Sequence, residues 1–546
     1  MNSSYKFRSG LVFFFFSSLY VIIACNLYLI QIKQRDFFSS LAQQQYTLTL
    51  TTHPPRALIT DRNGAPLAIN KESLSAFIEP KKIEQVAPLE RFLKKHFPGA
   101  LERWYAHRDA AFLFIKRKLT PEQQELIEQS ELTDIKLMKE PHRWYPIQAS
   151  GHVVGITDID NVGLFGIEAL YNDQLAGTPS TFTLQKDARS GAFYFDKKTA
   201  KAGTEGSPVQ LTIDSTLQFL VQEDVKDAVE HFQAKEGAVL VINPKNGEII
   251  VMTQYPSFDP NNTHTLEQEL TKNKAATESY ELGSVMKVFT ALAALEEGLV
   301  TPDEIIDCQN VKTGYIDGFK ISTWKAHDKL SFSQVIELSN NFGIAHVAKR
   351  LGPQLYDHYQ RLGFGKKTAL NWPGEQTGFV NPPHKWSRQS IISLSFGYEL
   401  SATLVQLAQA FCMIANNGVS VTPHIILDAH NPHEIGQLMY KPETIETVRS
   451  MLERTVSQGT AHRGAIKGYT VLGKTGTANM VIDGQYSTKH NTYTFAGIIE
   501  KGNYQRVIVT FIKEVPNAKS TLYASAVAVP LFEKVAEHLI LHDHIV

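Results

Sequence analysis

The sequence has almost no net charge and no run of basic residues. Its 546 residues carry 54 lysines and arginines against 55 aspartates and glutamates, for a formal net charge of -1 at pH 7. The chain therefore lacks the electrostatic surface that attracts nucleic acid, and no nucleic-acid partner is expected. Apolar residues make up 43% of the sequence, which is enough for the packed cores of two or three domains.

The sequence also has few residues arranged to bind a metal. Its three cysteines, Cys25, Cys308 and Cys412, form no C-x-x-C pair, and we predict free thiols, with a Cys308–Cys412 disulfide as the alternative. His538 and His542 are four residues apart near the C-terminus, but no H-E-x-x-H motif surrounds them, which favours a solvated helix end. We therefore expect neither a metal nor another cofactor.

Charged residues are absent from one long stretch, between Arg8 and Lys33. Within it, LVFFFFSSLYVIIACNLYLI (residues 11–30) supplies the roughly 20 apolar positions that a membrane-spanning helix needs. This predicts a transmembrane anchor over residues 10–32 behind a cytoplasmic tail, residues 1–9. A cleaved signal peptide is the alternative, but its apolar core would be shorter. Basic residues flank the run on both sides, so charge alone does not set its orientation.

Beyond the anchor, the patterns indicate an α+β protein with two further domains. We predict one domain over residues 33–205, where short helices and strands alternate without a catalytic constellation, and a second over residues 206–546. The second begins with a strand and a capped amphipathic helix over 209–232 and a strand pair over 237–256, continues with helical patterns, and ends with strands over 492–499 and 505–513 and a last helix. Strands at both ends with helices between them indicate one sheet assembled from distant segments and covered by helices.

Two places in the sequence match S-x-x-K. Ser284 and Lys287 open a helix that is apolar after its first turn, and their spacing places both side chains on one helix face. A serine needs a base to take its proton, and a lysine acts as that base only when burial or a nearby positive charge keeps its amine neutral. Ser322 and Lys325 lie in a polar stretch without an apolar helix behind it, which predicts a solvated loop. We therefore choose Ser284 as the candidate nucleophile.

Two more triplets follow the first S-x-x-K in chain order. Ser339-Asn340-Asn341 is an S-x-N at a turn between apolar helices. An apolar strand entrance then carries a K-T-G with a second hydroxyl, formed by Lys474, Thr475, Gly476 and Thr477. An earlier K-T-G at residues 312–314 lacks that hydroxyl and precedes the S-x-N, so we discount it. Ser322 stands only 17 residues before Ser339, and we do not expect the chain to reverse and dock it on the same loop.

In this order the triplets resemble those of the penicillin-binding proteins. The likeness covers nearly the whole chain and is to class B, the anchored monofunctional transpeptidases, since no acidic glycosyltransferase signature precedes residue 230. Further matching stretches are RALITDRNGAPLA (56–68), RWYP (143–146), GHVVGITD (151–158), GIEALYNDQLAGTP (166–179), NPKNGEIIVMTQYPSFDPN (243–261), PGEQTG (373–378), FGYELSATLVQLAQAF (396–411) and GYTVLGKTGTA (468–478). The chain departs from the family at Ala57, where glycine is usual, at Leu282, where proline is usual, and over residues 523–530, where Gly-Gly is usual.

The resemblance implies a fold and a reaction. The first domain would be an elongated α+β pedestal, and the second a β-lactamase-like domain with a central antiparallel sheet flanked by helices. Ser284 would attack the carbonyl between the two terminal D-alanines of a peptidoglycan stem peptide, with Lys287 as general base. Ser339 would relay a proton to the leaving D-alanine. The backbone N–H groups of Ser284 and Thr477 would form the oxyanion hole.

The resemblance also implies binding roles. Asn341 would hold the lysine amine of the S-x-x-K and a substrate amide, and Lys474 would supply positive potential. Thr475 and Thr477 would bind the substrate carboxylate, and Gly476 would let the peptide lie against the strand. The implied partners are peptidoglycan stem peptides and their lipid-linked precursor, the membrane, a membrane glycosyltransferase and other division proteins, with β-lactams as inhibitors.

The sequence leaves several alternatives open. A carboxypeptidase or a β-lactamase uses the same triplets but passes the acyl group to water. An elongation-type transpeptidase shares the motifs of the division type, which we favour. A non-catalytic division scaffold or β-lactam sensor would retain the pocket without forming cross-links. Since the substrate lies outside the cytoplasmic membrane, we expect a single-pass protein with its N-terminus in the cytoplasm and its catalytic domain in the periplasm or on the extracellular side.

Overall fold

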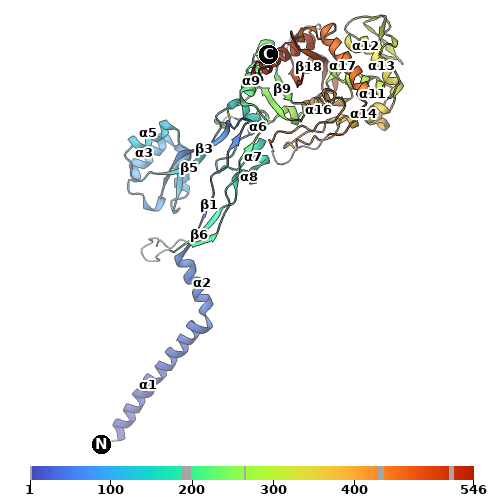
Figure 1. Cartoon of the computed structure of the whole chain (residues 1–546). Coiled ribbons are helices and arrows are strands. Elements are labelled where there is room, and N and C mark those ends of the chain that lie inside the picture. The colour runs from blue at the N-terminus through green and yellow to red at the C-terminus, as the bar shows by residue number, and fades with distance from the viewer. Residues whose placement is uncertain (1–2, 186–197, 264–265, 428–435, 516–521, 546) are drawn as a thin grey trace. The chain divides into compact units, whose positions relative to one another are not determined.

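The structure is a computed structural model that describes residues 3–185, 198–263, 266–427, 436–515 and 522–545. It divides into two compact units, Met1–Arg56 with Ala176–Ser207 and Ala57–Leu175 with Pro208–Val546. Helices alternate with mainly antiparallel sheets, which confirms the predicted α+β class (Figure 1).

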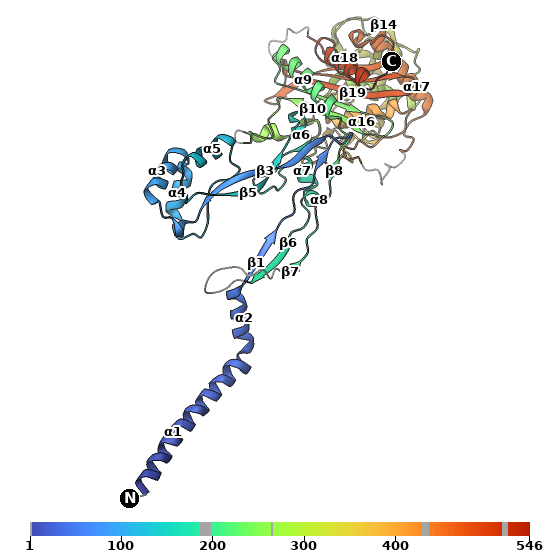
Figure 2. The same ribbon diagram turned by 60° about the vertical axis from the view of Figure 1, so that its left-hand side comes forward.

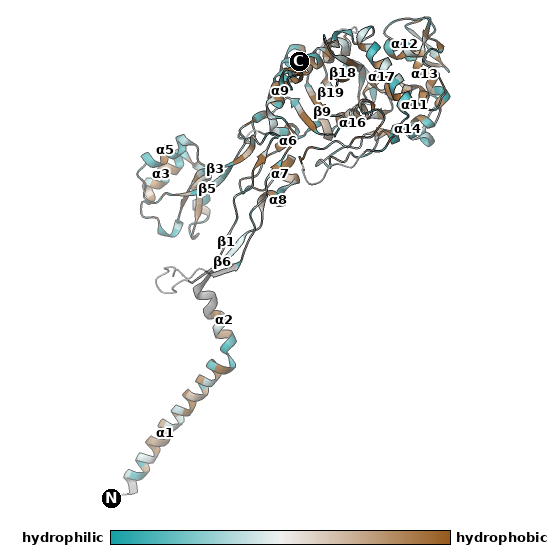
Figure 3. Cartoon of the chain, in the orientation of Figure 1, coloured by the Kyte–Doolittle hydropathy of each residue, from teal (hydrophilic) through white to brown (hydrophobic). Residues whose placement is uncertain are grey.

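The first unit begins with a long apolar helix. Helix α1 (Ser3–Tyr28) continues into a π-helical turn (Leu29–Lys33), and this stretch is long and apolar enough to cross a membrane. Figure 3 shows the apolar residues of α1 in brown. Helix α2 (Arg35–Tyr46) precedes an antiparallel sheet in which β6 lies between β1 and β7. These strands are β1 (Thr47–Thr52), β6 (Ser180–Gln185) and β7 (Lys198–Lys201).

In the second unit, residues 57–175 form a lobe around the long strand β3 (Pro66–Ile78). Its partners are β2 (Ile59–Thr60), β4 (Leu113–Lys116) and β5 (Lys136–Trp144), and β2 also pairs with β8 (Val209–Gln210). Beside β3 and β5 lie the helices α3 (Val86–His96), α4 (Pro98–Ala106) and α5 (Pro121–Gln129) (Figure 2). They share a separate apolar core that includes Leu93 and Trp104.

One ion pair of this lobe is completely buried. Arg143 Nε donates to Glu168 Oε1 at 2.6 Å, and both side chains are at most 1% exposed. The pair joins β5 to α7 (Gly166–Leu170), and so links the RWYP and GIEALYN stretches of the sequence. Removing either partner would leave an uncompensated buried charge, so the two stretches are fixed to each other.

The larger part of this unit is built on a five-stranded antiparallel sheet in the order β10-β9-β19-β18-β17. Its strands are β9 (Glu236–Ile242), β10 (Ile249–Tyr255), β17 (Thr470–Ile482), β18 (Gln485–Lys501) and β19 (Tyr504–Lys513). The prediction of one sheet assembled from distant segments is thus confirmed. The strand pair turns at Gly247, whose φ of +85° suits a residue without a side chain.

Alternate residues of β9 serve two different cores, because successive side chains of a strand point to opposite faces. Val239 and Val241 pack with α9 (Ser215–Phe232) and α18 (Ala524–His542), whereas Leu240 and Ile242 pack with α11 (Lys287–Glu296) and α16 (Leu404–Ala415). The sheet is therefore the middle layer between two sets of helices.

Apart from α17, the remaining elements are short, and most of them pack on the core that α11 and α16 share. The helices are α6 (Gly151–Val154), α8 (Asn172–Ala176), α10 (Lys274–Thr277), α12 (Phe332–Glu337), α13 (Asn341–Leu351), α14 (Gln354–Arg361), α15 (Ser390–Ser395) and α17 (Pro442–Ser457). The strands are β11 (Ile305–Asp307), β12 (Thr313–Ile316), β13 (Phe319–Ser322), β14 (Lys329–Ser331), β15 (Phe379–Val380) and β16 (Leu400–Ser401).

The cysteines and the C-terminal histidines are placed as follows. Cys308 and Cys412 are both buried and both free, so the alternative of a disulfide between them is wrong. Cys25 is free as well and exposed. His538, on α18, lies with Nε2 3.0 Å from Oδ2 of Asp224 on α9, and His542 lies with Nε2 3.4 Å from Oδ2 of Asp214, so each of these histidines has a carboxylate neighbour.

Candidate active site

Ser284 lies in a 3₁₀ turn, Gly283–Met286, directly before α11 begins at Lys287. Ser284 is partly exposed, whereas the side chain of Lys287 is completely buried. Gly283 has a φ of +58°, and a Cβ there would lie 2.7 Å from the carbonyl oxygen of Thr477. The turn that carries the serine therefore packs directly on strand β17.

Three predicted residues meet in one buried hydrogen-bonded group. Lys287 Nζ donates to the carbonyl oxygen of Ser339 at 2.7 Å and to its Oγ at 3.2 Å. Lys474 Nζ donates to the same Oγ at 2.9 Å and to the carbonyl of Thr475 at 3.3 Å. Both lysines are fully buried, and so the Ser339 hydroxyl lies between two amines that have no access to solvent.

This burial changes the protonation of both lysines. Desolvation, with the nearby charge of Lys474 as a smaller cause, lowers the pKa of Lys287 well below its ordinary value of 10.5. Desolvation alone lowers the pKa of Lys474 to about 7. A buried ammonium is costly, and a second one close by makes it costlier, so the neutral amine is favoured. The electrostatic setting is the one that the sequence predicted for Lys287.

Ser339 itself is held in an uncommon backbone conformation. Its φ is +55°, in the left-handed region that few residues other than glycine adopt. The next residue, Asn340, caps α13 by accepting the N–H of Gly343 at 2.9 Å. The cap fixes the turn, and the turn directs both the carbonyl and the hydroxyl of Ser339 at Lys287.

Asn341 does not join this group. Its Nδ2 donates to the carbonyl oxygen of Ser322 at 2.6 Å, and among the described residues no hydrogen bond connects Asn341 or the Ser284 hydroxyl to the Lys287 amine. The expectation that Ser322 would stay away from the S-x-N loop is wrong. Ser322 ends the hairpin β12–β13, and its carbonyl oxygen lies against the side chain of Asn341.

The discounted triplets occupy that same hairpin. Thr313 of the first K-T-G pairs with Ser322 of the second S-x-x-K, and their hydroxyls are 3.0 Å apart. Ser322 ends strand β13 rather than lying in a loop, but it and Lys325 are exposed, as predicted. No apolar helix covers Lys325, so the S-x-x-K spacing alone does not bury its amine.

Strand β17, on which the turn of Ser284 packs, forms another part of the site. Thr475 Oγ1 lies 3.4 Å from Thr460 Oγ1, and Thr477 Oγ1 accepts the backbone N–H of Ala524 at 3.1 Å. A Cβ at Gly476 would lie 2.3 Å from the carbonyl oxygen of Leu282. Gly476 is therefore required by the packing of the segment before Ser284, a reason other than the one that the resemblance implied.

Some neighbours of the site have no recognisable signal in the sequence. Thr460 contacts Thr475 from the loop after α17, and Trp324, 40% exposed, donates its indole N–H to the carbonyl of Leu338 at 2.6 Å. Both belong to segments whose local pattern shows only polar residues and turns. Their proximity depends on contacts between distant parts of the chain.

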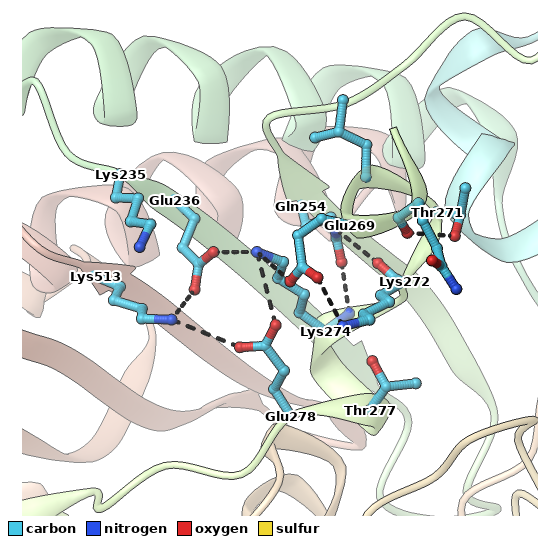
Figure 4. Close-up of polar contacts among 12 residues, drawn as sticks. Lys235, Glu236, Gln254, Glu269, Thr271, Lys272, Lys274, Thr277, Glu278 and Lys513 are labelled. Carbon is cyan, nitrogen blue, oxygen red and sulfur yellow. Dashed lines mark hydrogen bonds and ion pairs between the residues drawn. The ribbon is translucent and has the colours of Figure 1, made fainter. Parts of the chain in front are cut away.

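A network of ion pairs anchors the chain ahead of Ser284. Glu236, at the start of β9, is nearly buried and lies between Lys274 of α10 and Lys513 at the end of β19 (Figure 4). Both lysines also face Glu278, at 3.7 and 3.6 Å. Burial alone would raise the pKa of Glu236, but hydrogen bonds from the two lysines outweigh it and lower that pKa. The network ties two strands of the sheet to the segment that leads to the serine.

Comparison with known proteins agrees with this geometry. The family described as the penicillin-binding protein transpeptidase domain matches residues 237–537, and the penicillin-binding protein dimerisation domain matches residues 51–211. The probable peptidoglycan D,D-transpeptidase PenA of Neisseria meningitidis is 31% identical over 94% of this chain and 89% of its own. The peptidoglycan D,D-transpeptidase FtsI of Escherichia coli is 29% identical over 92% of this chain and 84% of its own.

A solved structure supports the same relationship. The crystal structure of penicillin-binding protein 3 from Mycobacterium tuberculosis, complexed with aztreonam, superposes with a TM-score of 0.69 at 26% identity, over 91% of this chain and 98% of the other. The order of the two matched domains is the order predicted for a class B protein. The chain belongs to the penicillin-binding proteins, in the class B form in which a dimerisation domain precedes a transpeptidase domain.

Proposed function

We propose that this protein is a serine-type peptidoglycan D,D-transpeptidase of the division type. The observation that carries the proposal is the fully buried amine of Lys287, one turn from Ser284 and hydrogen-bonded to Ser339. A neutral amine in that place can take a proton from a serine, which an exposed ammonium cannot. The named relatives are peptidoglycan D,D-transpeptidases, and they align over most of both chains.

In the proposed reaction Ser284 Oγ attacks the carbonyl carbon between the two terminal D-alanines while its proton passes to Lys287. The bond to the last D-alanine breaks, and its nitrogen takes the proton by way of the Ser339 hydroxyl, which contacts Lys287 at 3.2 Å. The remaining peptide is then held as an ester of Ser284. An amine of a neighbouring stem peptide attacks this ester, gives a proton to Lys287 and forms the cross-link, and the serine regains its proton.

The other predicted residues bind and polarise the substrate in this proposal. The backbone N–H groups of Ser284 and Thr477 stabilise the oxyanion, a contribution of about 3 kcal/mol per donor in other enzymes. Lys474 supplies positive potential, and the hydroxyls of Thr475 and Thr477 receive the substrate carboxylate. Asn341 binds a substrate amide from its place at the start of α13, after its contact with the Ser322 carbonyl is released.

The proposal also covers location and partners. We place the N-terminus in the cytoplasm, one helix in the membrane and the catalytic domain outside, where lipid-linked precursor, a membrane glycosyltransferase and other division proteins meet it. Protease added to spheroplasts should then digest the chain beyond residue 35, and full protection would contradict this topology. A fluorescent fusion should gather at midcell, whereas side-wall fluorescence would favour an elongation role.

The reaction is tested with the full-length chain in detergent, a donor stem peptide that ends in D-Ala-D-Ala, and an acceptor stem peptide. Mass spectrometry should detect the cross-linked dimer together with free D-alanine. Release of D-alanine with only hydrolysed donor would identify a carboxypeptidase. A stable penicillin adduct without either product would identify a β-lactam sensor.

A further inference from the structure

Glu281, three residues before Ser284, lies where three segments of the chain meet. Its side chain is half-buried, and one oxygen, Oε1, accepts two hydrogen bonds. The Tyr486 hydroxyl donates one at 3.0 Å from strand β18, and the backbone N–H of Glu399 donates the other at 3.0 Å. The Glu281 carboxylate thus connects the segment before Ser284 to the hairpin β17–β18 and to the turn at residues 397–399.

The turn fits closely against the segment of the serine. Tyr280 and Ala402 exchange both backbone hydrogen bonds, at 2.9 and 3.0 Å. Gly397 has a φ of +92°, and a Cβ there would lie 2.2 Å from the carbonyl oxygen of Gly283. The turn therefore touches the backbone immediately before Ser284, and a shift of the turn would move the serine.

Tyr398, from the same turn, also contacts the hairpin β17–β18. Tyr398 contacts Asn479 through its hydroxyl, at 3.2 Å to both the backbone nitrogen and Oδ1, and its ring meets that of Tyr486 edge to face at 5.0 Å. Asn479 Nδ2 donates to the carbonyl of Ser487 across the hairpin at 2.7 Å. Since Asn479 follows Thr477 by two residues on β17, these contacts hold the part of β17 that directly follows Thr477.

The charge of Glu281 has little compensation. Burial, with Glu399 as a smaller cause, raises the pKa of Glu281 to about 7, although the hydrogen bonds from Tyr486 and the Glu399 backbone lower it. Among the described residues, the titratable groups that face it are Tyr398, Glu399 and Tyr486, and none of them is a cation. The two hydrogen bonds are thus what favours the ionised carboxylate, and they strengthen when it is charged.

We propose that Glu281 is a positioning residue: its carboxylate clamps the β17–β18 hairpin and the turn at residues 397–399 onto the segment of Ser284, and thereby sets the distance between the nucleophile and the substrate-binding strand. The inference rests on the proposed function, since it concerns the same site. Glu281 acts through Tyr486 and Glu399 and does not itself contact the substrate.

The test compares Glu281→Gln and Tyr486→Phe with two control variants, Glu446→Gln and Tyr315→Phe. The side chain of Glu446 is 79% exposed, and Tyr315 is 64% exposed. Stopped-flow labelling of the full-length chain by a fluorescent penicillin gives the acylation rate constant and the fraction of chain that is labelled. We expect each clamp variant to lower the rate constant about tenfold with the labelled fraction unchanged, because Glu281→Gln takes the charge from both hydrogen bonds and Tyr486→Phe removes one of them. The controls should stay within twofold of the wild type.

The rate constant separates positioning from stability. A variant that only destabilises the fold would lower the labelled fraction and leave the rate constant of the labelled molecules unchanged, which would overturn the proposal. The loss of rate in the double variant Glu281→Gln/Tyr486→Phe should be smaller than the product of the two single losses, because both changes act on the contact between Tyr486 and Glu281. Losses that multiply would also overturn it.

Hydrogen exchange separates this inference from the proposed function. Amides of residues 479–492 should exchange faster in Glu281→Gln than in the wild type, and those of Glu446→Gln should not. If the wild type fails to react with penicillin but the hairpin loosens as described, the clamp stands and the proposed function fails. If the wild type reacts and neither the rate nor the exchange responds to Glu281→Gln, the clamp fails alone.

Discussion

Two regions of this chain carry the same short motifs and use them differently. The hairpin β12–β13 and the residues around it hold S-x-x-K and K-T-G within 14 residues, and their side chains are exposed. The other set is spread from Ser284 to Thr477, and its lysines, Lys287 and Lys474, are 0% exposed. A lysine that stays in water keeps its proton, whereas one buried beside a second cation favours the neutral amine. The comparison teaches that burial, and not spacing, makes S-x-x-K a candidate catalytic motif.

The strongest way to break this comparison is to find where penicillin attaches. A β-lactam mimics the D-Ala-D-Ala end and leaves no departing fragment, so it should remain on the nucleophile. Ser284→Ala should abolish labelling completely, and Ser322→Ala should label like the wild type. Peptide mass mapping identifies the site, and an adduct that survives Ser284→Ala would end the assignment.

The general base offers the next largest effect. Lys287→Ala should lower the acylation rate at neutral pH by about 10²–10⁴, the usual contribution of a general base. Lys287→Arg should not restore it, because a guanidinium stays protonated. Lys325→Ala is the matched control and should change the rate less than twofold. Labelling kinetics together with an unchanged melting temperature check the result, and near-normal acylation by Lys287→Arg would show that another group is the base.

The two K-T-G glycines, Gly476 and Gly314, differ in the atoms that surround them, and substitution by alanine tests this difference. In Gly476→Ala the new Cβ would lie 2.3 Å from the Leu282 carbonyl oxygen, and we expect a loss of stability of about 1–3 kcal/mol and slower acylation. In Gly314→Ala the nearest atoms belong to the side chains of Gln309 and Val311, at 2.8 and 2.9 Å, which can move. Denaturant unfolding should show less than about 1 kcal/mol for that variant. Equal losses would mean that the two sites are equally constrained.

The buried lysine of the K-T-G also predicts a pH dependence of stability. The pKa of Lys474 is about 7 in the folded protein against an ordinary 10.5, so between these values the unfolded chain holds a proton that the folded chain lacks. The free energy of unfolding should therefore gain up to about 1.4 kcal/mol per pH unit from this residue as the pH rises through that window. Below pH 7 both states are protonated and the slope disappears.

Substitution isolates this contribution from the other titrating groups. Lys474→Met should reduce the slope between pH 7 and pH 10 by its own share, about 1.4 kcal/mol per pH unit, and leave the share that comes from Lys287, whereas Lys325→Met, at an exposed position, should retain the slope of the wild type. Denaturant unfolding at several pH values measures it. A slope that is unchanged in Lys474→Met would mean that this lysine keeps its proton in the folded state.

The sequence by itself determined the local features. The uncharged stretch before Lys33 predicted an apolar helix long enough to cross a membrane, and the apolar residues after Lys287 predicted the buried helix α11. Alternating and continuous apolar runs predicted the strands, and their places at both ends of the domain predicted the shared sheet. These inferences succeed because the periodicity of apolar residues reflects which face of one element is buried.

Only the tertiary structure decided which distant groups meet. It placed Lys474 on the hydroxyl of Ser339 across 135 residues, returned Ser322 to Asn341, and gave Gly476 a neighbour in Leu282. It also brought the Glu281 carboxylate to the hydroxyl of Tyr486, which is 205 residues away in the chain. A local pattern specifies the conformation of its own segment, but the approach of two segments depends on how all the intervening elements pack, and that information is not contained in either segment alone.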